Sequence, residues 1–262
     1  MPGDAAPSGL ALFQLQVMER VVRLAEQQRK PSSDAGTRAD GQRHFVMPIA
    51  LLLVIDEVNG GDETAKELVT RFHLLHAESA SIIDFYFMGW YWVDVLDRHK
   101  GIRFDLSSFQ ACRQTLKHLG IKTFGGNADM ILVDAHCWLT PGASPRLSDV
   151  TLDFSEAIHI NLSSRRQLGD LPPLGEFLQA VVEAAEAVRA APVSQDHGVV
   201  FALSDRLGVA TAKRSFLTFV LDKFGAIIGA RKLEALSTRN IGPMIPLTEI
   251  KLSALRVHDG WR

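Results

Sequence analysis

The feature that most constrains the fold is an unbroken apolar run, MPIALLLVI, at residues 47–55. A strand with one face in water alternates apolar and polar residues, whereas a run without alternation is typical of a strand covered on both faces. An Asn-Gly-Gly turn follows, then Asp62 as an N-cap, and an apolar stripe over residues 65–75 predicts a helix. This part of the chain is therefore expected to supply the central strand and one covering helix of an α/β sheet.

Three further strands are expected. Residues 81–87 (SIIDFYF) should lie parallel to the first strand, because the intervening helix makes a right-handed crossover. Residues 129–135 and 152–162 are separated by the loop LTPGASPRLSD, which allows them to pair antiparallel. The expected fold class is therefore α/β with a mixed sheet.

Helices are expected between and after these strands. Ser107 and Gln110 form a capping-box pattern at the start of one helix, over residues 107–119, and an apolar stripe predicts another over residues 174–188. The resulting order, β-α-β-α-β-β-α over residues 45–190, resembles that of the thioredoxin family. The redox motif of that family is CxxC after the first strand, where this chain has DEVNGG. The resemblance therefore implies an element order and no redox role.

Three sections are expected along the chain. Residues 1–44 hold an amphipathic helix and a linker, residues 45–192 form the α/β core, and residues 193–262 form a helical extension packed on it. In that extension, LTEIKLSALR at residues 247–256 is expected to form a last short helix. Residues 205–262 carry ten Lys and Arg against five Asp and Glu. This basic section is either a solvated helix surface or a docking face for an acidic partner, another subunit or a polyanion.

Composition restricts the compartment and the partners. The two cysteines form no CxxC pair, which fits a reducing cytoplasm and excludes a disulfide framework. The start of the chain shows no secretory signal, and the apolar segment SFLTFVLDKFGAIIGA is shorter than the ~20 residues of a membrane span. A net charge of −2 gives no global reason to expect nucleic acid. The chain is expected to be cytoplasmic, without a membrane span, and to bind another protein or itself.

The pair Asp56 and Glu57, directly after the apolar run, is typical of the Walker B strand of a nucleotide hydrolase. Such a strand works with a phosphate-binding loop, GxxxxGK[ST], normally upstream of it. No upstream segment fits, and the later GVATAKRS and FGAIIGARK are incomplete matches without an evident preceding strand. A P-loop enzyme is therefore not expected.

A metal site is the alternative use of these acids. Each expected strand carries a carboxylate in or beside its apolar run: Asp56, Asp84, Asp134 and Glu156. By strict alternation Glu156 falls on the apolar face of its strand, where an unpaired charge costs several kcal/mol. If these strand ends converge, the four carboxylates are candidate Mg²⁺ ligands. Asp56, Glu57 and Asp84 would then be the catalytic residues of a Mg²⁺-dependent hydrolase of a phosphoester or nucleotide.

Simpler roles for the same carboxylates stay open. Asp56 and Glu57 also fit a strand that exits into solvent, Asp84 a carboxylate that binds backbone N–H groups, and Glu156 a bulge or an Arg partner. Cys137 and His159, on neighbouring expected strands, are a further candidate pair for a nucleophilic thiolate, although no glycine elbow or oxyanion loop accompanies them.

The segment FYFMGWYW concentrates aromatic residues, and its exit is expected to be an aromatic loop holding Trp90, Tyr91 and Trp92. These rings are either packed under the sheet or form a recognition surface, to which Gly125 and Gly126 of a Gly-rich segment are candidate neighbours. No complete catalytic motif is present. The function expected first is therefore a non-catalytic interaction module without a cofactor, docking partners through its terminal helices and its aromatic loop.

Overall fold

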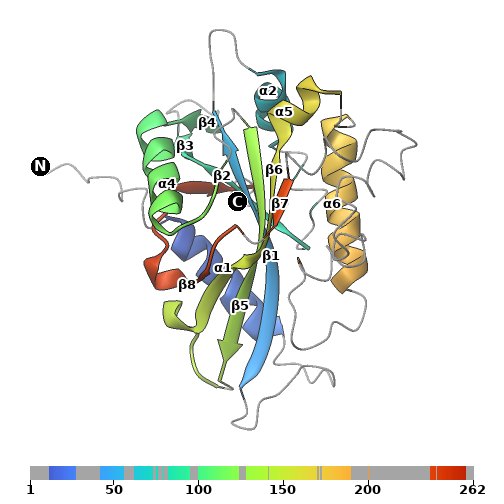
Figure 1. Cartoon of the computed structure of the whole chain (residues 1–262). Helices are drawn as coiled ribbons and strands as arrows, with labels where there is room; N and C mark the ends of the chain where they lie inside the picture. The colour runs from blue at the N-terminus through green and yellow to red at the C-terminus, as the bar shows by residue number, and fades with distance from the viewer. Residues whose placement is uncertain are drawn as a thin grey trace, which may run out of the picture.

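The computed structural model of the 262-residue chain is shown in Figure 1. It describes residues 12–27, 42–55, 62–72, 75, 79, 82–94, 100–123, 128–140, 142–169, 171, 173–189, 200, 237–239 and 241–257.

The main sheet is mixed, as the sequence predicts. Its four central strands are β1 (Arg43–Val54), β2 (Asp84–Met88), β5 (Ala128–Leu139) and β6 (Val150–Asn161). Strand β1 pairs in parallel with β2 and antiparallel with β5, and β5 pairs antiparallel with β6. The parallel pairing of β1 with β2 and the antiparallel pairing of β5 with β6 are the two expected from the sequence, and both are confirmed.

Helices cover both faces of the sheet (Figure 1). They are α1 (Leu12–Gln27), α2 (Glu63–Thr70), α4 (Leu106–His118), α5 (Leu162–Gln167) and α6 (Leu174–Arg189). On one side, called the α6 face, Ala50, Leu52 and Val54 of β1 share a core with α2 and α6. On the other, called the α1 face, Ile49 and Leu51 share a second core with α1 and α4. The prediction that this strand is buried on both faces is confirmed.

Two helix starts were predicted from capping patterns. Asp62 is the N-cap of α2 and its side chain accepts a hydrogen bond from the N–H of Thr64, as expected. The capping box at Ser107 and Gln110 is wrong, because α4 begins earlier. Its N-cap is Asp105, whose carboxylate accepts from the N–H groups of Ser107 and Ser108.

The expected aromatic loop after β2 is a hairpin of β3 (Trp90–Asp94) and β4 (Lys100–Phe104), which forms a separate two-stranded sheet. Aromatic and β-branched residues favour strands, and one side of this hairpin has core to pack against. The segment therefore had the composition of a strand, and the loop prediction was wrong.

The described C-terminal residues add short strands to the sheet. Strands β7 (Ser237–Arg239) and β8 (Met244–Pro246) pair with β6, and β9 (Ala254–Arg256) pairs with β2, which gives the order β7-β6-β5-β1-β2-β9 with β8 also on β6. The short helix expected at residues 247–256 is wrong: a 3₁₀ turn over Leu247–Glu249 leads to β9. The open edge of β2 accounts for this, because its backbone groups gain hydrogen-bond partners from β9. The remaining expected helices of this section, in residues 193–199 and 201–236, lie outside the described residues.

A bulge interrupts β6. Leu132 pairs with Ile158 but Asp134 pairs with Asp153, so β6 has extra residues between these two pairs. Phe154 bonds instead with Pro243 and Gly242. Strict alternation therefore fails here, and Glu156 is half-buried rather than facing the core. Within the described part of the chain, no helix is long and apolar enough to cross a membrane.

Candidate functional site

The sequence-predicted site residues fall in three places. Asp56, Glu57, Gly125 and Gly126 lie outside the described residues. The other carboxylates lie within the main sheet, and the aromatic residues lie on the hairpin.

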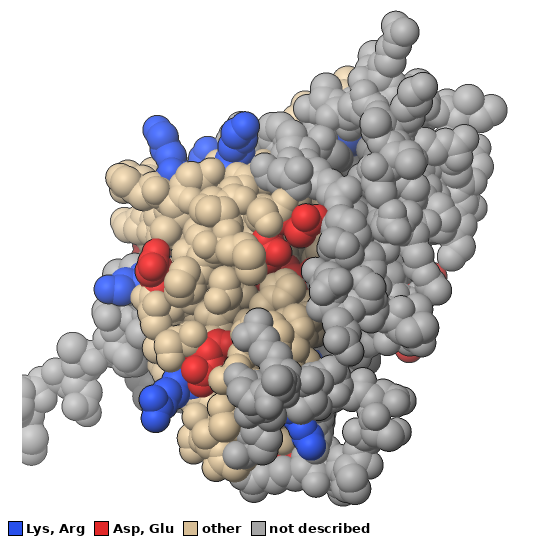
Figure 2. All heavy atoms as spheres, turned by 60° about the horizontal axis from the view of Figure 1, so that its bottom comes forward, with Lys and Arg blue, Asp and Glu red and all other residues tan. Residues whose placement is uncertain are grey.

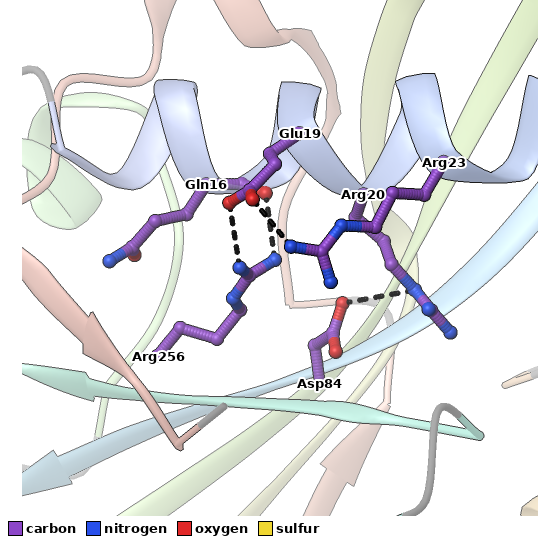
Figure 3. Close-up of polar contacts among 6 residues, drawn as sticks. All are labelled: Gln16, Glu19, Arg20, Arg23, Asp84 and Arg256. Atoms are coloured by element: carbon purple, nitrogen blue, oxygen red, sulfur yellow. Dashed lines mark hydrogen bonds and ion pairs between the residues drawn. The ribbon is translucent and has the colours of Figure 1, made fainter. Parts of the chain in front are cut away.

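Asp84 begins β2 on the α1 face and is 5% exposed. Helix α1 packs across this face because Phe13, Val17 and Val21, at helical spacing, are fully buried against the sheet. Arg20 lies one turn from Val17, and its Nε is 3.6 Å from Oδ2 of Asp84 (Figure 3). This position gives Asp84 a cationic partner from the N-terminal helix.

A second charged residue links α1 to the sheet beside Asp84 (Figure 3). Arg256 of β9, which is 3% exposed, donates from Nη1 to the backbone oxygen of Gln16 at 3.1 Å. It also donates from Nη2 to Glu19 Oε2 at 2.8 Å. Glu19 accepts in addition from Arg23 of its own helix. The described contacts around Asp84 are thus ion pairs and hydrogen bonds within α1 and between α1 and the sheet.

Asp134 lies on the opposite face of the sheet from Asp84. It falls at even spacing from Met130 and Leu132 of β5, whose side chains belong to the core of the α6 face. Asp134 and Asp84 are therefore not brought together. Within the described residues, no group of three or more His, Cys, Asp or Glu side chains is arranged to hold a metal ion.

Asp134 instead belongs to a group of titratable residues on β1, β5 and β6, here called the Asp134 cluster: His44, Asp134, His136, Asp153 and Glu156. Asp134 is 1% exposed, and its Oδ2 accepts the N–H of Val200 at 2.6 Å. Its Oδ1 is buried and has no hydrogen-bond partner among the described residues. Desolvation raises the pKa of this carboxyl to about 7; the Val200 N–H opposes that change, and the charges of Asp153 and Glu156 add to it.

Asp153 of β6 is paired directly with Asp134 of the neighbouring strand β5. Its Oδ1 accepts from the N–H and the hydroxyl of Ser155, at 3.0 and 2.6 Å, which fixes the orientation of the carboxylate. Its Oδ2 is 3.7 Å from Nε2 of His136, beyond hydrogen-bond distance. The bulge that follows Asp153 brings Glu156 close enough to act on Asp134.

Two histidines extend the cluster towards solvent. Nε2 of His44 is 3.0 Å from Nδ1 of His136, and the His44 ring stacks on Trp138 with centroids 3.9 Å apart. Burial lowers the pKa of His136, although the charge of Asp153 opposes this change. A neutral His136 fits the geometry, because its Nδ1 then accepts from His44 while its Nε2–H points towards Asp153.

The three hairpin aromatics have different environments. Trp90 is buried, and its Nε1 donates to the backbone oxygen of Val54 at 3.0 Å. Trp92 is half-buried and packs edge-on against Phe72, just after α2. Tyr91, between them in sequence, points to the other side of the hairpin and is 41% exposed. Of the three, Tyr91 is therefore the ring most available to a partner.

Cys137 and His159, the candidate pair for a nucleophilic thiolate, are not brought together. Cys137 lies opposite Val150 in the register and His159 opposite Ile131, which places them about 20 Å apart along the sheet. Burial also raises the pKa of the Cys137 thiol to about 12, so this sulfur is protonated at neutral pH. The arrangement does not support nucleophilic catalysis by this pair.

Two members of the Asp134 cluster, Asp153 and His44, were not singled out by sequence reasoning as companions of Asp134. His136 had a signal, since it is two residues from Asp134 and so shares its face. Asp153 and His44 had no local sequence signal, because only the strand register brings them close to Asp134.

A scan against protein-family models and searches of curated proteins and of solved structures find no match to this chain.

Proposed function

We propose that this chain is a non-catalytic protein-interaction module that docks a partner through the outward face of the β3–β4 hairpin. The observation that carries this proposal is the division of the hairpin into a buried face and an exposed face. Tyr91 and Arg103 lie opposite each other in the register and are both exposed. Tyr and Arg are enriched among the residues that contribute most to binding at protein interfaces.

The buried face makes the hairpin a firm support for these two side chains. Trp90 packs on Phe104 with ring centroids 5.3 Å apart, and Phe104 packs on Phe109 of α4 at 5.5 Å. With Trp92 against Phe72, the hairpin is anchored to elements on both sides of the sheet. An exposed Tyr on an anchored support loses little conformational freedom on binding, which favours affinity.

We propose for the core a thioredoxin-like arrangement into which the hairpin is inserted. The strand order β6-β5-β1-β2, in which only β1 and β2 are parallel, supports it, as do α2 and α6 on one face and α4 on the other. The two buried free cysteines, Cys112 and Cys137, support the proposal of a reducing, cytoplasmic compartment.

A protein partner fits the net charge of −2 better than a nucleic acid does. Figure 2 looks onto the end that lies at the bottom of Figure 1. Uncharged side chains form most of the described surface there, carboxylates lie among them, and Lys and Arg lie at its margins. Phosphate binding favours clustered Lys and Arg.

Matched surface variants test the proposal. Tyr91→Ala and Arg103→Ala remove the exposed pair, while Leu168→Ala removes another exposed side chain, on the turn after α5, and serves as the control. Proteins retained by the wild type and by Leu168→Ala, but not by the hairpin variants, are identified by quantitative affinity purification. One of them is then purified, and its dissociation constant is measured by calorimetry.

We expect each hairpin variant to weaken that binding by roughly tenfold or more, with melting temperatures within about 2 °C of the wild type. Binding that is equal for all three variants would refute the hairpin as the docking surface. So would the absence of any protein selectively lost by the hairpin variants.

A further inference from the structure

The Asp134 cluster is not used by the proposed docking surface, and it places a fully buried carboxyl beside two further acids. Among the described residues, Asp134 accepts a hydrogen bond from one backbone group that is far away in the sequence, the N–H of Val200. We infer that Asp134 is a proton-binding site whose ionisation sets the strength of the hydrogen bond that holds Val200 in the core of the α6 face.

The first support is the geometry of Asp134 itself. One carboxyl oxygen accepts the Val200 N–H at 2.6 Å, while the other is buried and has no partner in the described part of the chain. A buried carboxylate that accepts one hydrogen bond and has no cation beside it among the described residues is poorly stabilised, which favours the protonated form.

The charged neighbours act in the same direction. On β6, Asp153 lies opposite Asp134, and Glu156 also acts on it. On β5, His136 is two residues away and favours its neutral form, and on β1, His44 bonds to His136. The described acids of α6, which covers this face, are all exposed at its outer side: Glu176, Glu183 and Glu186. Among the described residues, the charges that act on Asp134 are those of Asp153 and Glu156, and both repel it.

The hydrogen bond from Val200 opposes this repulsion. A backbone N–H that favours the ionised carboxyl is, by thermodynamic reciprocity, bound more tightly by the ionised carboxyl. Protonation turns a charge-assisted hydrogen bond into a weaker neutral one. The pKa of Asp134, about 7, places this change near neutral pH. Acidification from about pH 8 to about pH 6 therefore loosens the attachment of Val200, which is 2% exposed and packs in the core.

NMR on the full chain tests both parts of the inference. The protein is labelled with ¹³C-aspartate and ¹⁵N, and the Asp134 carboxyl carbon and the Val200 amide are followed from about pH 4.5 to about pH 9. We expect both signals to titrate with a common midpoint near neutral pH. A Val200 amide that does not titrate, or a midpoint at the ordinary pKa of aspartate near about 4, would overturn the inference.

Variants of the neighbouring acids separate this titration from that of other groups. Asp153→Asn and Glu156→Gln each remove a repelling charge, so the common midpoint moves to lower pH. Glu176→Gln, on the outer side of α6, is the matched control and leaves it unchanged. Asp134→Asn removes the Val200 titration, and its amide oxygen still offers an acceptor to the N–H.

If Asp134→Asn does not fold, the two neighbouring variants decide the matter. A midpoint that neither of them shifts contradicts the inference, as does a Val200 titration that persists in folded Asp134→Asn.

Discussion

Asp134 has a direct consequence for the pH dependence of stability. Its folded-state pKa, about 7, lies above its ordinary value of 3.8 because the site is desolvated. Between about pH 4 and pH 7 the folded protein holds a proton that the unfolded chain has released. Stability from this group is therefore fully present below the unfolded-state pKa and is lost as the pH rises through the folded-state pKa.

Asp134→Asn is expected to remove this decline, because an amide does not titrate. Between about pH 5 and pH 8 the wild type should lose on the order of 2–3 kcal/mol of unfolding free energy that the variant keeps. Urea denaturation at the two pH values measures the difference, with Glu176→Gln as the control. An identical pH dependence in wild type and Asp134→Asn would contradict the assignment.

Arg20 is the second residue whose effect can be stated from its contacts. It is the described cation beside Asp84, which stays buried when the arginine is removed. Arg20→Met is expected to lower the unfolding free energy by about 2–3 kcal/mol, because the buried carboxylate loses a compensating charge.

The double variant Arg20→Met/Asp84→Asn separates charge from packing. The double variant should recover part of the loss, because it also removes the buried charge that Arg20 faced. Thermal and urea unfolding of the two variants give the comparison. If the double variant is less stable than Arg20→Met, the ion pair is not the reason for the effect.

At the scale of elements, the connection from β2 to β3 depends on Gly89. Its φ is +77°, its N–H donates to Ser253 and its oxygen accepts from Asp105. A Cβ at this position would lie 2.6 Å from Cβ of Phe109, closer than real Cβ contacts. Gly89 therefore allows the hairpin, α4 and the C-terminal segment to approach one another.

Gly89→Ala is expected to destabilise the protein by about 2–4 kcal/mol, from the unfavourable φ together with the clash. Gly142→Ala is a matched control, because Gly142 has φ +79° but nothing within 4 Å of its Cβ position. Gly142→Ala should lower the free energy of unfolding by about 1 kcal/mol, because it has the unfavourable φ without the clash. Denaturant unfolding of both variants isolates the packing contribution, and equal losses would mean that the clash with Phe109 is relieved at no cost.

The elements also show what the sequence can predict. Strand β1 was predictable because its apolar run lacks alternation, is short for a helix and is followed by an Asn-Gly-Gly turn sequence, which together favour a strand buried on both faces. The bulge in β6 was not, because Phe154 bonds with Gly242 and Pro243, far along the chain. Strand β9 could not be predicted for the same reason, because its strand conformation depends on pairing with the edge of β2 and not on a local sequence pattern. The Asp134 cluster needs both the β1–β5 and the β5–β6 registers, so only one of its neighbours, His136, was within reach of local spacing.

For the whole molecule, the described helix nearest the N-terminus and the described strand nearest the C-terminus are held to each other. Helix α1 packs its apolar side on the sheet, and Arg256 of β9 bonds to both Gln16 and Glu19 of that helix. Strand β9 in turn pairs with the edge of β2, where Asp84 forms an ion pair with Arg20. Segments 240 residues apart in sequence thus form one unit on the α1 face. The α6 face has its own core and its own helices.

This division predicts that the two faces respond separately to the loss of Arg256. Arg256→Met keeps a long apolar side chain but removes two charge-assisted hydrogen bonds, each worth about 1.5–3 kcal/mol. Local opening of α1 and β9 should therefore become at least roughly tenfold more frequent, while α6 is unaffected. Hydrogen–deuterium exchange with mass spectrometry measures this in peptides covering each element. Arg23→Met, which removes the other arginine bound to Glu19 at a half-exposed site, should change exchange in α1 by less than about threefold. Equal acceleration in α1 and α6 would mean that the protein opens as a single unit and that its two faces are not separable.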